Sequence, residues 1–152
     1  MCKNVTLRVD GDPKAQPRPR SFAMRGKSGK YSARVYDPGT AEFWKSLIAI
    51  AAREKIVRPF AGPVVVEMSF CIRRPKSHYR TGKNAAQLKP AAPNYHTSKP
   101  DVDNFAKAVL DALTTIGAWK DDSQVAGLSA RKIYGEQPGA IIQIAALPEV
   151  EN

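Results

Sequence analysis

The sequence predicts a small single domain of the α/β (α+β) class, with a mixed β-sheet of about four strands and two helices. The chain has 152 residues, of which 43% are hydrophobic, so it has the length of one domain and enough apolar side chains for a core. Segments with strand patterns alternate with two segments of helical periodicity, and no internal repeat is visible. Residues 1–152 are therefore expected to form one domain.

Four segments have the composition of β-strands. Residues 5–9 alternate apolar and polar side chains, which predicts a half-buried strand that opens the sheet. Residues 64–72 are rich in β-branched side chains, which predicts a well-buried central strand. Residues 124–134 and 140–147 predict two further strands, and the short glycine-containing segment between them predicts a hairpin.

Two segments have helical periodicity. The first begins after Thr40, a plausible N-cap, and runs to about Glu54. The second covers residues 101–116 and ends at Gly117, which suits the position after a helix. The apolar face expected for the first helix is formed by Phe43, Leu47, Ile50 and Ala51, widened by Trp44 and Ile48.

The charge is divided unevenly along the chain. Residues 1–100 contain 20 Lys or Arg against 6 Asp or Glu, whereas residues 101–152 contain 4 against 8. An excess of basic residues in one part indicates a polyanionic partner, and clustered carboxylates in the other indicate a site that needs them. A general excess of solubilising charge is the alternative interpretation.

Two basic loops, at about residues 11–36 and 73–99, hold most of this positive charge. Both are rich in proline and glycine and lack periodicity, apart from a possible hairpin at about 31–36. Arginine and lysine in such loops suit contacts to DNA phosphates, the alternative being a solvated loop. The candidate DNA-binding residues are Arg18, Arg20, Arg25, Lys27, Lys30, Arg73, Arg74, Lys76, Arg80 and Lys99.

The second loop also contains rings. Tyr79, Tyr95, His78 and His96 could stack on exposed bases, or could cover the core of the loop itself, which is the favoured interpretation.

No feature of the sequence indicates a membrane or an exported protein. The longest apolar run, residues 47–52, is too short to span a bilayer, and the first residues lack the apolar stretch of a secretory signal. Cys2 and Cys71 are too few for a disulfide framework, and neither is proposed as a nucleophile. We expect a cytoplasmic protein with reduced thiols.

The second predicted helix concentrates its charges on one face. Asp103, Lys107 and Asp111 follow one another at intervals of four residues, opposite the apolar face that contains Phe105 and Val109. Ion pairs between residues four apart would explain this spacing without any function.

Further carboxylates lie at the two ends of this helix. Asp101 is at its start, where it could cap the helix, and Asp121 and Asp122 follow its end, where they could form a turn. Taken together, these carboxylates repel one another unless something neutralises them. A hard divalent cation such as Mg²⁺, which prefers oxygen ligands, would do so.

A carboxylate site on a basic surface suits the cleavage of nucleic acids. Cations hold the phosphate backbone, while a metal activates water and stabilises the charge on phosphorus. Lys107, one turn after Asp103, would offset charge on the scissile phosphate. The residues alone thus predict a Mg²⁺-dependent nuclease, and the alternative is a DNA-binding architectural protein without catalysis.

The residues 101–113 and 117–125 carry a specific pattern. They contain Asp-Val-Asp-Asn-Phe-x-Lys at the helix start and Gly-x-Trp-x-Asp-Asp-x-Gln-Val after its end. This pattern resembles the signature of the RusA-type Holliday junction resolvases, endodeoxyribonucleases common in phages and prophages. The basic segments 17–20 and 73–79 resemble those of longer phage-type members. Two departures, Phe105 for the more usual leucine and the longer N-terminal loop, bear on junction and sequence preference.

The resemblance implies a homodimer that cuts four-way DNA junctions by paired symmetric nicks with Mg²⁺, for which Mn²⁺ could substitute. It implies a location in a bacterial or phage-infected host cell, and a role in DNA recombination and repair. A nuclease for other branched DNA would use the same site. The family's metal-binding aspartates correspond to Asp101, Asp103 and Asp122, its catalytic lysine to Lys107, and Asp121 takes a lesser, supporting role at the metal.

Overall fold

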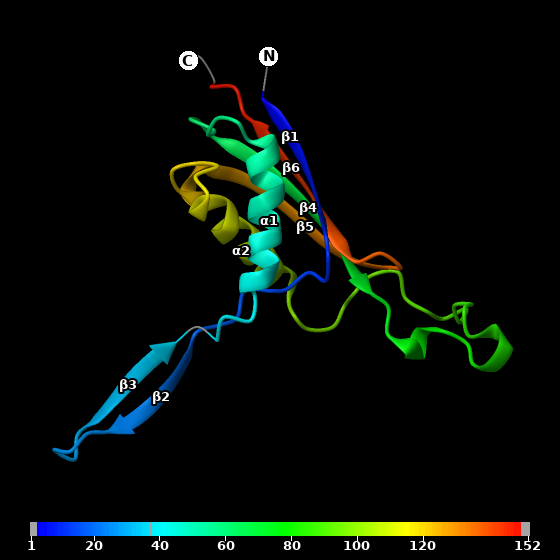
Figure 1. Cartoon of the computed structure of the whole chain (residues 1–152), viewed down its shortest axis with the longest axis horizontal. Helices are drawn as coiled ribbons and strands as arrows, with labels where there is room; N and C mark the ends of the chain where they lie inside the picture. The colour runs from blue at the N-terminus through cyan, green and yellow to red at the C-terminus, as the bar shows by residue number, and fades with distance from the viewer. Residues whose placement is uncertain (1–2, 37, 150–152) are drawn as a thin grey trace.

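The computed structural model describes residues 3–36 and 38–149. Two helices, α1 (Glu42–Lys55) and α2 (Val102–Thr115), cover one face of a four-stranded mixed sheet (Figure 1). A separate two-stranded hairpin extends away from this body. The predicted fold class, a small α+β domain with two helices and a mixed sheet, is confirmed.

The sheet has the order β1-β6-β4-β5. The strands are β1 (Asn4–Asp10), β4 (Val64–Arg73), β5 (Val125–Gly135) and β6 (Gly139–Ala146). β6 pairs antiparallel with both β1 and β4, whereas β5 pairs parallel with β4. The prediction of a central strand at 64–72 is confirmed, because β4 has a neighbour on each edge.

The predicted hairpin between the last two strands is wrong, because β4 lies between β5 and β6. The connecting residues 136–138 pass from one side of β4 to the other, roughly 10 Å or two strand spacings, which three extended residues can reach. The cause is the apolar character of β4, whose Val64, Val66, Met68 and Phe70 are all buried. An apolar strand of this kind is favoured inside a sheet, where a neighbouring strand forms hydrogen bonds to each of its edges. If β5 paired directly with β6, β4 would not have these two strands as its neighbours.

The buried face of α1 agrees with the predicted one only in part. Trp44 and Ile48, predicted at the edge of that face, are buried together with Ala52, and Leu47 and Ala51 are partly buried against the core. Phe43 and Ile50, predicted within the face, are 77% and 56% exposed. Apolar side chains occupy so much of this helix that their spacing alone does not determine which of them face the core. Packing against α2 and β1 selects the row at 44, 48 and 52.

The predicted end of α2 is confirmed, whereas the predicted N-cap of α1 is wrong. Ala41, not Thr40, occupies the N-cap position of α1, and no side chain caps it. At the end of α2, Gly117 has a φ of 77° and its N–H donates to the Thr114 carbonyl at 3.0 Å. This confirms the predicted helix end at Gly117, where a residue without Cβ adopts the left-handed conformation at little cost.

One hydrophobic core lies between the helices and the sheet. Within the described residues every fully buried side chain is apolar, so the charged groups all lie at or near the surface. The largest fully buried side chains are Trp44, Trp119, Phe70, Leu7, Ile48, Leu113, Ile142 and Ile144.

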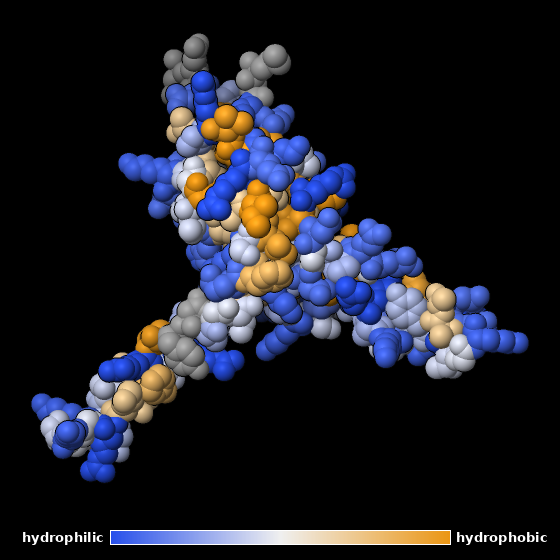
Figure 2. Space-filling view, in the orientation of Figure 1, coloured by the Kyte–Doolittle hydropathy of each residue, from blue (hydrophilic) through white to orange (hydrophobic). Residues whose placement is uncertain are grey.

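Two segments project from the body in different directions (Figure 1). The first is the hairpin of β2 (Arg20–Arg25) and β3 (Tyr31–Tyr36), which confirms a hairpin in this loop and extends it to residue 20. The second, residues 74–99, contains two short 3₁₀ turns, Lys76–His78 and Gly82–Asn84. Figure 2 shows that both projections are largely hydrophilic with interspersed apolar side chains.

No helix in residues 3–36 and 38–149 has the length and hydropathy needed to cross a membrane. Cys2 lies outside the described residues. Cys71 is a free, partly buried thiol, and burial raises its pKa, which disfavours the nucleophilic thiolate.

Candidate active site

The first turn of α2 presents two carboxylates. Asp101 occupies the N-cap position in an extended conformation, and its side chain makes no capping hydrogen bond. Its main-chain carbonyl accepts from the N–H groups of Asn104 and Phe105 at 3.2 and 3.4 Å. Asp103 Oδ1 accepts from the Asn104 N–H at 2.9 Å. The helix is therefore started by the backbone of Asp101, and the Asp101 carboxylate is not used as a cap.

Lys107 joins α2 to the segment that follows it. Its Nζ lies 2.7 Å from Asp111 Oδ1 and 3.6 Å from Asp122 Oδ2. The hydrogen bond to Asp111, assisted by the charges of Asp111 and Asp122, raises the pKa of Lys107, which is therefore a cation at neutral pH. The spacing of this face suggests ion pairs of Lys107 with both Asp103 and Asp111. Among the ion pairs of the described residues, the pair with Asp111 is present and the pair with Asp103 is not. Asp122, which pairs with Lys107 instead, lies in the turn that follows α2.

A second lysine contacts the same carboxylate from the neighbouring helix. Lys45 Nζ of α1 lies 3.9 Å from Asp111 Oδ2 and 3.6 Å from Glu42 Oε1. Asp111 thus bridges the two helices and keeps Lys107 turned toward Asp122, a role that the sequence analysis did not give it.

The turn after α2 is built around Trp119 and Asp121. Trp119 is buried in the core, and its indole N–H donates to Thr114 Oγ1 at 2.8 Å. Asp121 Oδ1 accepts from the Ser123 N–H at 2.8 Å, and this bond lowers the pKa of Asp121. Asp121 therefore stabilises the 3₁₀ turn Asp122–Gln124, which positions Asp122.

Gln124 attaches this turn to the segment that precedes β4. Its side-chain oxygen accepts from the Lys120 N–H at 2.9 Å, and its side-chain amide donates to the carbonyls of Phe60 and Gly62, each at 3.0 Å. These three bonds hold the chain on both sides of Asp122. The glutamine of the sequence pattern is thus a support for the carboxylate next to it.

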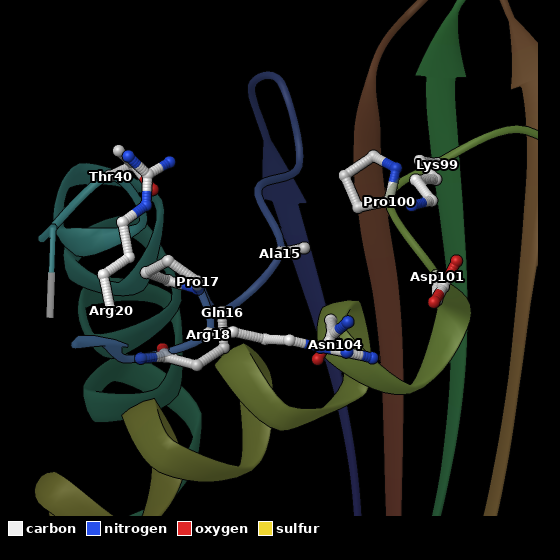
Figure 3. A pocket seen from close by; sticks show the side chains of 10 residues that line it. All are labelled: Ala15, Gln16, Pro17, Arg18, Arg20, Thr40, Lys99, Pro100, Asp101 and Asn104. Atoms are coloured by element: carbon white, nitrogen blue, oxygen red, sulfur yellow. The ribbon is translucent and has the colours of Figure 1, made fainter. Parts of the chain in front are cut away.

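A cleft of about 610 Å³ lies between the base of the hairpin and the start of α2 (Figure 3). It brings together three of the predicted DNA-binding cations, Arg18, Arg20 and Lys99, with the predicted metal ligand Asp101. The Gln16 N–H donates to the Asn104 carbonyl at 2.8 Å, which joins the hairpin base to α2. The other lining residues are Ala15, Gln16, Pro17, Thr40, Pro100 and Asn104.

The donor chemistry of Asp101, Asp103 and Asp122 fits a hard divalent cation, because all three offer carboxylate oxygens and no soft ligand lies among them. The three carboxylates are not gathered around one point in this structure. In the described parts of the chain, no three histidine, cysteine, aspartate or glutamate side chains are close enough together to hold one ion. Asp122 is turned to the Lys107 ammonium instead.

Five of the remaining seven candidate DNA contacts fall into two groups of exposed residues. Arg25, Lys27 and Lys30 are exposed at the far end of the hairpin, away from the cleft. Lys76 and Arg80 are exposed on the second projection.

Arg73 and Arg74 have partners within the protein. Arg73 Nε lies 3.6 Å from Asp12 Oδ1. Arg74 donates to the Pro93 carbonyl at 2.7 Å, and its guanidinium lies 5.5 Å from the centre of the Tyr134 ring. Arg74 therefore holds the second projection together and against β5.

The histidines of the second projection pack on the protein itself. The rings of His78 and His96 lie 4.8 and 5.1 Å from that of Tyr134, both at steep angles. This arrangement supports the interpretation that they cover the loop's own core. Burial, with the nearby charge of Lys132, lowers the pKa of His96. Tyr95 is 62% exposed.

Several residues that lie at the site were not predicted from the sequence to be part of it. Thr40 and Asn104 line the cleft, and Asn104 could have been found from its place in the pattern beside Asp103. Lys45 and Lys132 lie on other elements, and nothing in the local sequence distinguishes them from solvated surface lysines.

Comparison with known proteins supports the expected family. The family model of the endodeoxyribonuclease RusA matches residues 10–145. The uncharacterized protein YqaN of Bacillus subtilis (strain 168) is 34% identical over 145 residues, which cover 92% of this chain and 94% of YqaN. The crossover junction endodeoxyribonuclease rusA of Lactococcus phage r1t is 38% identical over 50 residues, 33% of this chain and 38% of that protein. The chain therefore belongs to the RusA family of endodeoxyribonucleases, which confirms the predicted class of enzyme, a structure-specific endodeoxyribonuclease.

Proposed function

We propose that this protein is a Mg²⁺-dependent resolvase of four-way DNA junctions, which it cuts by paired symmetric nicks as a homodimer. The observation that carries the proposal is the cleft at the N-terminus of α2, which is lined by Arg18, Arg20 and Lys99 together with Asp101. Three cations beside one carboxylate suit a phosphodiester backbone held next to a catalytic group. We place its action in the cytoplasm of a bacterial or phage-infected cell, in DNA recombination and repair.

In this proposal the cleft holds the DNA strand. The two arginines can each donate paired hydrogen bonds to phosphate oxygens, and Lys99 adds a point charge on the opposite side. The positive end of the α2 dipole points to the same place and favours an anionic ligand. The backbone of the strand is thereby positioned beside Asp101 before the reaction begins.

Lys107 is the proposed charge stabiliser. Its ammonium is protonated and is held between Asp111 and Asp122 by contacts of 2.7 and 3.6 Å. Placed in advance, it can offset the negative charge that develops on the phosphate oxygens during cleavage.

Asp101, Asp103 and Asp122 would hold Mg²⁺, with Asp121 supporting Asp122. When bound, the metal supplies an activated water and a positive charge for the phosphate. Mn²⁺, which also prefers oxygen ligands, would substitute for it.

A dimer suits the substrate, since a four-way junction has approximate two-fold symmetry and two identical sites can address two opposed strands.

The test is cleavage of a synthetic four-way junction and of a linear duplex with the same sequences, with and without Mg²⁺. We expect nicks at symmetric positions on the junction, only with Mg²⁺, and none with Asp103→Asn, which should still bind the junction. Glu54→Gln, an exposed carboxylate elsewhere on the surface, is the matched control and should cleave normally.

Equal cleavage of other branched DNA would broaden the substrate class. Tight junction binding without cleavage in Mg²⁺ or Mn²⁺ would overturn catalysis and favour an architectural protein.

A further inference from the structure

A lysine on β5 is bonded to the segment that leads into the candidate site. Lys132 Nζ donates to the Ser98 carbonyl at 2.8 Å and to the Pro100 carbonyl at 2.6 Å. The side chain is partly buried, and its ammonium lies 6.0 Å from the centre of the Phe105 ring. A protonated lysine bonded to two carbonyls makes charge-assisted hydrogen bonds, which are stronger than neutral ones.

The position of these two carbonyls along the chain is informative. They flank Lys99, which lines the cleft, and the second belongs to the residue immediately before Asp101. Lys132 therefore holds the backbone on both sides of one proposed DNA contact and directly before one proposed metal ligand.

The backbone of β5 holds the preceding part of the same segment. The His96 N–H donates to the Lys132 carbonyl at 3.1 Å, and the Tyr134 N–H donates to the Asn94 carbonyl at 2.8 Å. This backbone pairing ends at His96, and α2 begins at Val102. The Lys132 side chain spans the interval between them.

We infer that Lys132 is a positioning residue for the reaction: it sets the place of Asp101 and Lys99 in the cleft through the carbonyls of Ser98 and Pro100. This inference rests on the proposed function. A displacement of about 1 Å of a catalytic group can reduce a rate on the order of 100-fold, so a lysine that contacts no reacting atom can still control the rate.

Three variants separate this role from general packing. Lys132→Met keeps a flexible apolar stem beside Phe105 and removes the ammonium. Lys132→Arg keeps a cationic donor. Arg131→Met removes an exposed cation from the adjacent position of the same strand and is the matched control.

The measurements are single-turnover cleavage of the junction, junction binding without divalent cation, and hydrogen–deuterium exchange. For Lys132→Met we expect cleavage to slow about 30- to 100-fold with binding within about two-fold of the wild type. Exchange should become faster at the Asn104 and Phe105 amides, which donate to the Asp101 carbonyl. Lys132→Arg should recover much of the rate, and Arg131→Met should match the wild type.

Wild-type cleavage and exchange in Lys132→Met would overturn the inference. Loss of binding at an unchanged rate would also overturn it, since Lys132 would then be a phosphate contact. If Lys132→Met does not fold, Lys132→Gln, which removes the charge and shortens the reach, replaces it with the same expectations. If the wild type does not cut junctions, the proposed function fails, and the exchange measurement still decides whether Lys132 positions Asp101.

Discussion

The two basic projections have the same kind of sequence and different surroundings. Residues 13–36 and 68–100 each contain seven Lys or Arg and no acidic residue. The base of the hairpin forms one side of the cleft that also contains Asp101, so Arg18 and Arg20 line the proposed reaction centre. The second projection is bound to β5 through Arg74, His78 and His96, all of which contact Tyr134. Equal charge density therefore does not mean equal function, because neighbouring groups decide which cations remain for DNA.

The largest loss of activity is expected at Lys107, which contacts Asp111 and Asp122 in the candidate site. Replacing Lys107 by methionine should lower the cleavage rate about 100- to 1,000-fold, as expected for loss of a positioned charge in the transition state. Junction binding, measured by fluorescence anisotropy, should change little. A rate within a few-fold of the wild type would show that the charge at this position is not used.

The hairpin base and the second projection can be compared directly with two double variants that remove the same charge. Arg18→Ala with Arg20→Ala should reduce kcat/KM on the junction about 30- to 100-fold, because both phosphate contacts and strand placement are lost. Lys83→Ala with Lys89→Ala, on the second projection, should reduce it only a few-fold through weaker long-range attraction. Equal losses would break the comparison.

Arg74 tests whether the second projection uses a cation for its own structure. Arg74→Met removes the hydrogen bond to the Pro93 carbonyl and the contact with Tyr134. Opening of residues 74–96 should become easier by about 1–2 kcal/mol. Hydrogen–deuterium exchange of the Tyr134 amide, which donates to Asn94, reports this opening. Exchange in the hairpin should not change.

The smallest expected effect is a dependence on pH that only the second projection should show. Burial lowers the pKa of His96 in the folded protein, so the His96 ring resists protonation while the second projection is packed against β5. The packing of the second projection against β5 is then fully stable at a pH above the ordinary histidine pKa of about 6.5, and it weakens as the pH falls below that value. The charge of Lys132, which lies nearby, opposes protonation further.

The measurement is exchange at the His96 and Tyr134 amides at several pH values, corrected for the intrinsic rate. His96→Phe, which keeps a ring against Tyr134, should remove the dependence. The hairpin contains no histidine and should show none.

Local patterns predicted the parts of the molecule that local forces build. The α2 helix, its end at Gly117 and its charged face follow from apolar periodicity and from the conformation that glycine permits. The strands at β1 and β4 follow from alternation and from β-branched content. In the candidate site, the resemblance assigned roles to Asp101, Asp103, Lys107 and Asp122 through their spacing on one helix and the turn after it.

Other features depended on segments far apart in the chain. The pairing of β5 and β6 with β4 was predicted wrongly, and the exposure of Phe43 and Ile50 on α1 was not predicted, because pairing and packing partners are not encoded by periodicity. The same holds for the site, where Lys132 reaches Ser98 and Pro100 across 34 and 32 residues.

The sequence by itself thus determined the class of enzyme, the helix that carries the carboxylates and the excess of basic residues that suits DNA. Only the tertiary structure decided which of the basic residues lie beside Asp101, and which are bound to the protein instead. The physical reason is range: helix periodicity and capping act over a few residues, whereas a side chain's partners are set by contacts between elements that meet only when the chain is folded.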